Sequence, residues 1–265
     1  APSTDFPEWY AVLKNVVPLK GHVRRAPTDI AMLLYTSGST GTPKGVMHSF
    51  ERATAASLGF ANYIRREHDP EAAIRLLSSL PLVHLFERAL IECASYIDGT
   101  AHIFFAETLD TFVADLNRAR PTCFVSVPRL WLKFQQGVFA KMPPKKLDRL
   151  LGIPIVGRLV AKKVLKGLGL DQARLAASGS APIPAELINW YRRLGLNLME
   201  GYGMTEDFAY SHSSTPKLTA PGCVGAPMEG VKVRLSEEGE ILIKSPGQLV
   251  GYYKRPDLDA EVFTE

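Results

Sequence analysis

Cysteine is scarce in this sequence, and the spacing that a metal site or a disulfide framework requires is absent. The 265 residues contain only Cys93, Cys123 and Cys223. Their number is odd, they lie far apart, and no CxxC pair occurs, which argues against a zinc site and against a disulfide-rich secreted scaffold. We therefore expect three buried, reduced thiols, as is usual in a cytoplasmic protein.

Long apolar runs are missing as well, and the first residues do not have the layout of a leader sequence. No stretch of eighteen or more apolar residues occurs, so no transmembrane helix is predicted. The first residues, APSTDFPEWY, lack both the layout of a signal peptide and an initiator methionine. The sequence looks like a portion of a longer chain, and we expect a cytoplasmic location.

Three widespread functional motifs are also absent. No GxSxG pentapeptide occurs, so no serine is predicted to be the nucleophile of a hydrolase. The stretch GYGMTE ends in Glu206, where the dinucleotide motif GxGxxG requires glycine. Around Lys44, Pro43 and Gly45 occupy the positions where a Walker loop requires glycine and then serine or threonine.

Charge is unevenly distributed along the chain. The net charge is +4, with 46% hydrophobic and 22% charged residues, which is typical of a globular protein. Residues 141–166 carry eight basic side chains and one acid, a local net charge of +7 that leaves −3 for the remainder. Such a local excess indicates either an anionic partner or a solvated basic face.

Short apolar runs alternate with helix-length segments over most of the chain. Four runs are predicted to be strands: 30–36, 101–106, 123–127 and 174–178. Helices are predicted to start at Ser49, to start at Asp110, and to cover 182–195 with a stop at Gly195. This alternation predicts an α/β fold with a mainly parallel sheet and helices on both faces.

The pattern changes after about residue 222. The stretch VKVRLSEEGEILIKS alternates with period two around SEEG, which predicts an antiparallel hairpin. We therefore expect residues 1–222 to form a central α/β part and residues 223–265 to begin a β-rich, barrel-like subdomain.

A loop rich in glycine, serine and threonine, YTSGSTGTPKG (35–45), follows the first predicted strand. In such a loop the backbone N–H groups converge on an anion, and hydroxyl groups and a lysine add donors and charge. Phosphate is the predicted ligand. The alternative is a flexible surface turn.

The order of residues in this loop resembles a known signature. YTSGSTGTPKGVMHS is similar to the phosphate-binding segment of the adenylate-forming superfamily, which includes acyl-CoA synthetases, peptide-synthetase adenylation domains and luciferases. ASGSAPIP (177–184) and EGYGMTE (200–206) resemble its adenine-binding segments, and GEILIKSPGQLVGYYKRPDLDAEVFTE resembles the stretch before its ribose-binding aspartate. LPLVHLFERA and RPTCFVSVPRLW are similar to the long-chain fatty acyl-CoA synthetase branch. The resemblance extends from about residue 20 to the end.

The resemblance implies a two-step reaction that uses ATP, Mg²⁺ and coenzyme A. A fatty-acid carboxylate attacks the α-phosphate of ATP to give an acyl-adenylate and pyrophosphate, and a thiol then displaces AMP. Both reactants of the first step are anions, so catalysis rests mainly on positioning and charge neutralisation.

The resemblance also implies a role for individual residues. Lys44 neutralises the β/γ end of ATP, Thr205 contacts the α-phosphate, Glu206 is the magnesium ligand, and Tyr202 packs on adenine. Taken alone, Tyr202 is also compatible with a core position and Glu206 with a solvated surface. The phosphate loop comprises Thr36, Ser37, Gly38, Ser39, Thr40, Gly41 and Thr42. Close approach of the backbone to the nucleotide is expected at Gly179, Ser180, Ala181, Gly201 and Gly203.

Two residues correspond to the acyl side of the site. His84 matches a position that shapes the approach of the carboxylate and the thiol, and the alternative is a merely packed or exposed histidine. Trp131 matches a tryptophan that gates the fatty-acid tunnel, and the alternative is a buried core indole.

The basic stretch contains a predicted amphipathic helix. In GRLVAKKVLKGLGL, Val160, Val164 and Leu168 fall on one face, with four cations elsewhere. This helix is expected either to contact the anionic inner surface of a membrane or to lie as a solvated helix over the core. No nucleic-acid partner is expected, because no interleaved aromatic residues accompany the lysines.

The resemblance implies that the chain is a middle portion of the large domain, without the small carboxy-terminal lid. We therefore expect weak nucleotide binding with little or no turnover by this chain alone. Two alternatives to a fatty-acid–CoA ligase remain: a nucleotide-binding module without catalysis, and an adenylating enzyme that delivers acyl groups to a carrier-protein phosphopantetheine. No oligomeric state is predicted.

Overall fold

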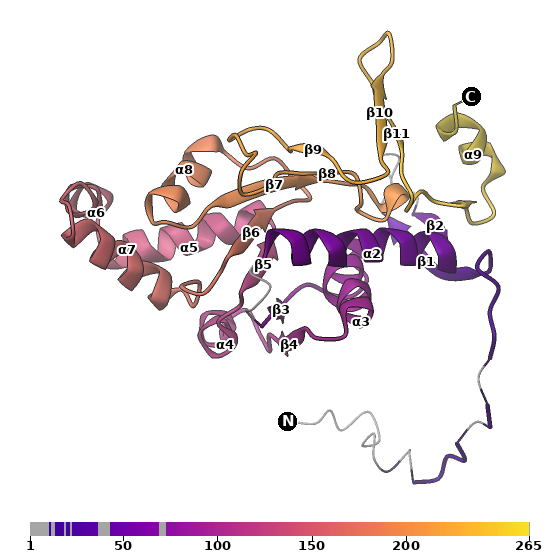
Figure 1. The fold of residues 1–265 in the computed structure, drawn as a ribbon, viewed down its shortest axis with the longest axis horizontal. Helices are drawn as coiled ribbons and strands as arrows, with labels where there is room; N and C mark the ends of the chain where they lie inside the picture. Colours follow the sequence, from indigo (N-terminus) through magenta and orange to yellow (C-terminus); the bar gives the residue numbers. More distant parts are fainter. Residues whose placement is uncertain are drawn as a thin grey trace.

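The fold is seen in a computed structural model (Figure 1). The structure describes residues 11, 14–18, 20–21, 23–36, 43–68 and 73–264. Six residues of the predicted phosphate loop, 37–42, lie outside the described residues. The expected mixed α/β class is confirmed by helices and strands that alternate from β1 to α9.

Parallel pairing occurs where short apolar strands were predicted. Strand β3 (Arg75–Ser78) pairs with β4 (His102–Phe105). Strand β6 (Leu175–Ser178) lies between β5 (Cys123–Ser126) and β7 (Leu198–Tyr202), and both pairs are parallel. The strands predicted within 101–106, 123–127 and 174–178 are therefore confirmed.

These strands are covered on both faces, as predicted. Adjacent residues of one strand enter different buried clusters: Leu76, Cys123, Leu175 and Met199 belong to one, and Leu77, Phe124, Ala176 and Leu198 to the other. Successive side chains of a strand point to opposite faces, so the two clusters lie on opposite sides of the layer formed by the β3–β4 sheet and the β5–β6–β7 strands. The short apolar runs of the sequence reflect this double burial.

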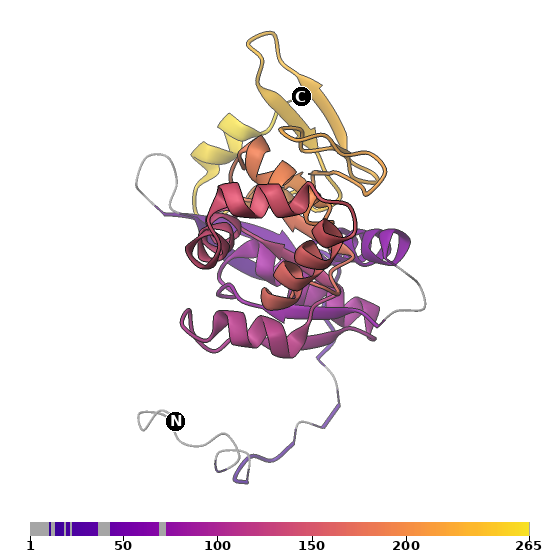
Figure 2. The ribbon, with the colours of Figure 1, turned by 90° about the vertical axis from the view of Figure 1, so that its left-hand side faces the viewer.

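Different helices cover the two faces (Figures 1 and 2). One face is covered by α2 (Phe50–Glu67), the π-helix η1 (Glu87–Cys93) and α3 (Ala94–Asp98). The other face is covered by α4 (Phe112–Ala119), α5 (Pro128–Lys141), α6 (Pro144–Leu151), α7 (Val156–Gly167) and α8 (Ala185–Arg193).

Two of the predicted helix ends are confirmed by local geometry. The hydroxyl of Ser49 accepts a hydrogen bond from the backbone N–H of Arg52 at 3.4 Å and so caps α2. Gly195 follows α8 with φ +88°, a conformation that glycine adopts without steric cost.

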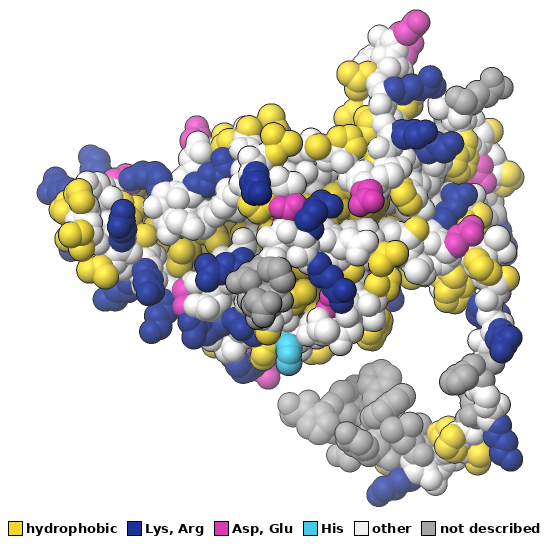
Figure 3. All heavy atoms as spheres, viewed as in Figure 1, with side chains coloured by type: hydrophobic (Ala, Val, Ile, Leu, Met, Phe, Trp, Pro, Cys, Tyr) yellow, Lys and Arg dark blue, Asp and Glu magenta, His cyan; other side chains and the backbone are white. Residues whose placement is uncertain are grey.

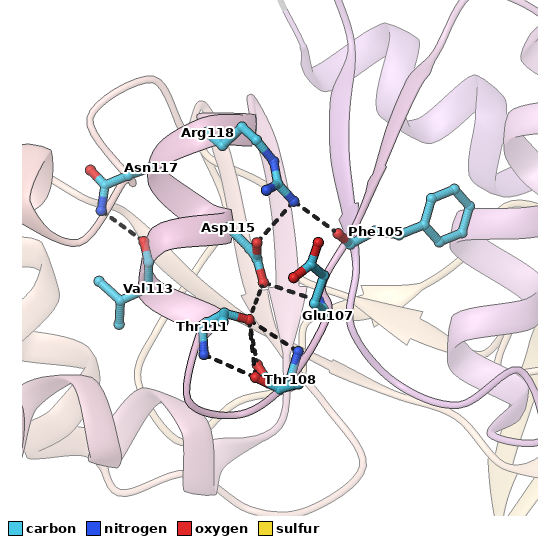
Figure 4. A network of polar contacts seen from close by, with 8 residues as sticks. All are labelled: Phe105, Glu107, Thr108, Thr111, Val113, Asp115, Asn117 and Arg118. Atoms are coloured by element: carbon cyan, nitrogen blue, oxygen red, sulfur yellow. Dashed lines mark hydrogen bonds and ion pairs between the residues drawn. The ribbon is translucent and has the colours of Figure 1, made fainter. Parts of the chain in front are cut away.

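Helix α4 begins two residues later than predicted from Asp110. Figure 4 shows the cause: the Thr111 hydroxyl donates to Asp115 at 2.9 Å, and Asp115 also accepts from the backbone N–H of Glu107 at 3.0 Å and pairs with Arg118 at 2.8 Å. Thr108 and Thr111 also bind each other, since the backbone N–H of each donates to the hydroxyl oxygen of the other at 3.1 Å, and this keeps the segment between them in a turn. The backbone N–H of Glu107 contributes most to a lowered pKa of Asp115.

The first predicted strand pairs differently from the expected parallel arrangement. Strand β1 (Ile30–Thr36) pairs antiparallel with β2 (Lys44–Ser49), a strand that the sequence analysis did not predict. Thr36 lies opposite Lys44 in the register, so the two ends of the predicted phosphate loop are adjacent. The hairpin arises because only the loop separates the two strands, whereas a parallel pair needs a long crossover.

Strand β12 (Gly251–Tyr252) completes this sheet from the far end of the chain. It pairs antiparallel with β2. Helix α2 reinforces the connection, because Arg52 donates from Nη1 to the carbonyl oxygens of Gln248 and Leu249 at 2.9 and 2.6 Å.

The remaining elements are antiparallel or short. Strands β8 (His212–Ser213) and β9 (Ala226–Pro227) extend the sheet beyond β7. The predicted hairpin is confirmed as β10 (Lys232–Leu235) and β11 (Ile241–Lys244), which project from the body (Figures 1 and 2). Helix α9 (Pro256–Val262) follows β12. The boundary near residue 222 stays a prediction.

The predicted basic helix is present as α7, but its apolar face is occupied. Val160, Val164 and Leu168 pack against the buried cluster of that side of the sheet. The face expected to contact a membrane is therefore part of the core. None of the described helices is both long and apolar enough to cross a bilayer.

All three cysteines are free, as predicted, but they are not all buried. Cys123 is buried and Cys93 is partly buried, whereas Cys223 is exposed. Burial raises the pKa of Cys123 to about 12, which keeps this thiol protonated and unreactive.

Candidate functional site

A cavity of about 550 Å³ lies where the carboxyl ends of β5, β6 and β7 meet. Carboxyl ends of parallel strands meet at one edge of the sheet, and ligands of α/β proteins bind at this edge. Residues predicted from widely separated motifs line the cavity together: Thr36, His84, Gly179, Ser180, Gly201, Tyr202, Gly203, Thr205 and Glu206.

Three of the predicted residues do not line this cavity. Lys44 begins β2, with its Nζ atom 5.8 Å from the centroid of the Tyr252 ring. Ala181 is exposed just beyond the lining residue Ser180. Trp131 is fully buried in the core on the other side of the sheet. Ser37, Gly38, Ser39, Thr40, Gly41 and Thr42 lie outside the described residues.

The carboxylate of Glu206 is held from the neighbouring antiparallel sheet. The Tyr252 hydroxyl donates to Glu206 Oε1 at 2.7 Å, and the backbone N–H of Leu249 donates to the Glu206 carbonyl at 2.6 Å. Burial, and then the hydrogen bond to Glu206, raise the pKa of Tyr252. The phenol therefore stays protonated and remains a donor at physiological pH.

A buried histidine of β2 holds the backbone of Thr205 in place. His48 has no exposed surface, and its Nε2 lies 2.8 Å from the Thr205 carbonyl oxygen. A carbonyl only accepts, so Nε2 carries the proton. Burial lowers the pKa of His48, and its ring packs edge-on against Phe208 at 5.0 Å. The hydrogen bond from this neutral ring fixes the position of the Thr205–Glu206 turn relative to β2.

The turn closes through Asp207. Its Oδ1 accepts from the backbone N–H of Met204 at 2.8 Å, which fixes the short 3₁₀-helix η2 (Thr205–Asp207). Burial, the largest influence, raises the pKa of Asp207 to about 7, and the nearby charge of Glu206 contributes in the same direction.

This raised pKa predicts a pH dependence of stability. An unfolded aspartate has a pKa of about 3.9, so between about pH 4 and 7 the folded chain keeps a proton that the unfolded chain has lost, and stability falls as the pH rises. Asp207→Asn should remove this dependence. Urea unfolding at pH 5, 6, 7 and 8 gives the free energy of unfolding of both proteins. As the pH rises toward 7, the free energy of unfolding of the variant relative to that of the parent should increase by up to about 1.4 kcal/mol per pH unit.

The exposed residue Asp110 supplies the matched control. Asp110→Asn should follow the parent at every pH. An Asp207→Asn variant with the same pH profile as the parent would show that Asp207 is ionised in the fold throughout this range.

Tyr202 and the small residues form one wall of the cavity. The Tyr202 ring lies 6.0 Å from the ring of His212, inclined by 56°. A Cβ atom on Gly203 would come within 2.6 Å of the Ala209 backbone, so this position of the motif admits only glycine without rearrangement. Ser180 has φ +68°, a region that non-glycine residues adopt rarely and often at ligand sites.

His84 reaches the cavity on a loop that the following helix holds. Glu87 is buried and accepts from the backbone N–H of Ser79 at 3.0 Å, while Arg88 donates from Nε to the Leu82 carbonyl at 3.0 Å. Burial lowers the pKa of His84, so its ring is neutral at physiological pH. Its Nδ1 is buried and has no hydrogen-bond partner among the described residues.

Several lining residues were missed by sequence reasoning. Ser178, His212 and Ser213 line the cavity, and Ser178 is buried with an Oγ that lacks a partner in the described part of the chain. Strand β8, which brings His212 to the site, is only two residues long. No sequence period identifies so short a strand.

Comparison with known proteins identifies a family. The family described as "AMP-binding enzyme" matches residues 3–253. The chain is 30% identical to long chain acyl-CoA synthetase 5 of Arabidopsis thaliana, over 91% of this chain and 41% of that protein. It is 31% identical to long-chain-fatty-acid–CoA ligase 1 of Homo sapiens, over 89% of this chain and 38% of that protein.

Solved structures resemble the fold as well. ATP-bound MatB from Rhodopseudomonas palustris superposes with a TM-score of 0.72 and 26% identity, over 97% of this chain and 47% of that one. The chain thus spans less than half the length of these relatives.

Proposed function

Because this chain belongs to the AMP-binding enzyme family, we propose that its cavity binds ATP and that the protein activates a medium- or long-chain fatty acid as acyl-adenylate and then as acyl-CoA. The chain spans only 38–41% of the length of the two curated relatives. The complete two-step reaction is therefore proposed for the protein of which this chain is a part. The supporting observation is the convergence of Thr36, Tyr202, Thr205 and Glu206 on one cavity. We also propose a cytoplasmic location.

In this proposal the adenine and the phosphates of the nucleotide contact different residues of the cavity lining. Tyr202 and the backbone at Gly179 and Ser180 receive adenine. The hydroxyl groups of Thr36 and Thr205 donate to phosphate oxygens, and Lys44, at the exit of the phosphate loop, neutralises the β/γ end. This arrangement counters the repulsion between two anionic substrates.

The residues present fit a magnesium ion of the kind that accompanies ATP. Mg²⁺ is usually held by one or two carboxylates plus substrate phosphates and water. Glu206 supplies one oriented carboxylate, and the described residues contain no cluster of three or more potential ligands that would hold a metal without substrate. When bound there, the ion would neutralise phosphate charge.

The acyl side of the cavity is apolar. Phe60, Val83, Leu85, Phe86 and Leu90 line it, which suits an acyl chain because each buried methylene contributes roughly 0.8 kcal/mol. In the reaction, the acyl carboxylate oxygen bonds to the α-phosphorus as pyrophosphate leaves, and a thiol sulfur then bonds to the acyl carbon as AMP leaves. The neutral ring of His84 stands where the carboxylate and the thiol approach.

The test combines nucleotide binding with pyrophosphate exchange. Calorimetric titration should detect ATP binding to this chain in the presence of Mg²⁺. A protein that forms acyl-adenylate should transfer labelled pyrophosphate into ATP only when a suitable acid is present, tested with acids of two to eighteen carbons. ATP binding without acid-dependent exchange by the complete protein would favour the binding module, and absence of ATP binding would contradict the proposal.

Tyr252→Phe should weaken the metal-dependent part of ATP binding. The substitution removes the donor that orients Glu206, and loss of an outer-shell partner typically costs 10- to 100-fold in metal affinity. We expect the ratio of ATP affinities with and without Mg²⁺ to fall roughly 10-fold, measured by titration in Mg²⁺ and in EDTA. Tyr253→Phe, at a neighbouring position, is the control and should keep the parental ratio. An unchanged ratio for Tyr252→Phe would remove its positioning role.

A further inference from the structure

We propose that the corner between α6 and α7 is a docking surface for an anionic lipid bilayer, with an apolar tip that inserts between the headgroups. The apolar tip consists of Ile153, Ile155, Val156 and Leu159. This inference does not depend on the proposed reaction. It concerns residues other than the apolar face of α7 that packs into the core.

The apolar tip is unusually exposed for its composition. The exposed fractions are 72% for Ile155 and 65% for Leu159, and Ile153 and Val156 are exposed as well. Ile153, Ile155 and Val156 lie in the turn before α7 and at its first residue, and Leu159 lies one helical turn after Val156. Grouped exposed aliphatic side chains of this kind mark an interaction surface, whereas scattered ones do not.

The backbone holds the tip outward. Ile155 has φ +68° and ψ −58°, and the Val156 N–H donates to the Pro154 carbonyl at 2.8 Å, which closes a three-residue turn. This turn is rare and strained, especially for a β-branched residue. The turn leaves the Ile155 side chain in solvent, and backbone strain of this kind is a mark of functional segments.

Cations surround the apolar tip. Figure 3 shows hydrophobic side chains framed by lysine and arginine at the end of the molecule that carries α6 and α7. Seven exposed cations follow these helices: Lys145, Lys146, Arg149, Arg158, Lys162, Lys163 and Lys166. Within the described residues none of the seven forms an ion pair. Asp148, the only acid of residues 141–166, is paired with Arg193 at 2.8 Å.

Charge complementarity selects the occupant. An aliphatic tip between two helices that carry exposed cations matches an anionic leaflet, where the aliphatic groups reach the acyl boundary while the cations stay among the headgroups. A two-fold contact with a second copy would bring two surfaces of net charge +7 together. Nucleic acid would leave the aliphatic tip against water or phosphate, because single-strand binding relies on aromatic stacking.

The proposal predicts vesicle binding that depends on lipid charge and on salt. The chain should co-sediment with vesicles of 30% phosphatidylserine and 70% phosphatidylcholine at low salt, and little with pure phosphatidylcholine or at high salt. Replacing Arg158, Lys162, Lys163 and Lys166 together by glutamine should weaken binding on the order of 1,000-fold, at about 1 kcal/mol for each cation. The double variant Ile155→Asn, Leu159→Asn should weaken binding by roughly 10-fold or more.

Matched controls use similar residues elsewhere on the surface. Leu218→Asn changes an exposed leucine outside the corner, and Lys232→Gln with Arg234→Gln removes two cations of the β10–β11 hairpin. Both should bind vesicles as the parent does. Asparagine accepts positive φ more readily than isoleucine, so Ile155→Asn should fold. Hydrogen exchange of the parent with and without vesicles tests the surface without any variant and should show protection within residues 150–166.

Four outcomes would overturn the proposal. These are failure of the parent to bind anionic vesicles, equal binding by parent and corner variants, protection elsewhere on the chain, and a dimer in solution that the tip variants dissociate. The last result would assign the corner to contact between two copies.

Discussion

Glu206→Gln is expected to abolish the gain in ATP affinity that Mg²⁺ provides, a loss on the order of 100-fold. Removing even an outer-shell partner of a metal ligand typically costs 10- to 100-fold in metal affinity, and this change removes the proposed charged ligand itself. The amide keeps the size of the side chain and still accepts from Tyr252, whose hydroxyl lies 2.7 Å from Oε1 in the parent. The loss therefore reports on charge rather than on packing.

The ratio of affinities with and without Mg²⁺ is the quantity to measure. Without the metal, loss of a carboxylate next to the phosphates should strengthen ATP binding, because it removes repulsion. With the metal, the variant should bind more weakly than the parent. Glu237→Gln, in the exposed turn of the β10–β11 hairpin, should keep the parental ratio. A Glu206→Gln variant with a parental ratio would place the metal elsewhere.

Trp131→Ala is expected to lower the free energy of unfolding by about 3–5 kcal/mol, the usual loss for a buried aromatic side chain. Trp131 has no exposed surface, and its ring centroid lies 5.3 Å from that of Phe124 and 5.0 Å from that of Tyr191. The Tyr191 hydroxyl donates to the Trp131 carbonyl at 2.7 Å. This cluster joins β5, α5 and α8, so its loss should destabilise the packing of the helices on one face of the sheet.

Urea unfolding of three variants separates a core role from a tunnel role. Trp131→Phe should recover much of the stability, and Leu132→Ala, at the adjacent exposed position of α5, should change it by less than about 0.5 kcal/mol. The tunnel function of Trp131 stays a prediction. The tunnel role would be supported if Trp131→Ala had near-parental stability but a changed preference among acids of different chain length.

Local patterns in the sequence identified the parts of the molecule whose cause is local. Ser49 caps α2 through a hydrogen bond three residues away, and the β10–β11 turn lies within one short stretch. The motif glycine Gly203 is likewise explained by a close approach within a few residues. Double burial of the central strands also left a visible trace, because strands covered on both faces are apolar throughout.

Contacts between distant segments could not be predicted in this way. Strand β2 contains the buried His48, whose partner, the Thr205 carbonyl, is 157 residues away. Tyr252 and Glu206 meet only after β12 returns to β2. The helix from Asp110 was misplaced by two residues because reciprocal hydrogen bonds between Thr108 and Thr111 hold a turn before the first helical residue. Each case depends on tertiary packing that residue periodicity does not encode.

The return of β12 to β2 decides where the chain tolerates shortening. A deletion mutant that ended at the predicted boundary near residue 222 would expose the edge of β2, because its partner strand comes from residues 251–252. The same cut would deprive Arg52 of the carbonyl groups of Gln248 and Leu249. The smallest fragment suitable for crystallisation or ligand screening must therefore retain the chain through Tyr252.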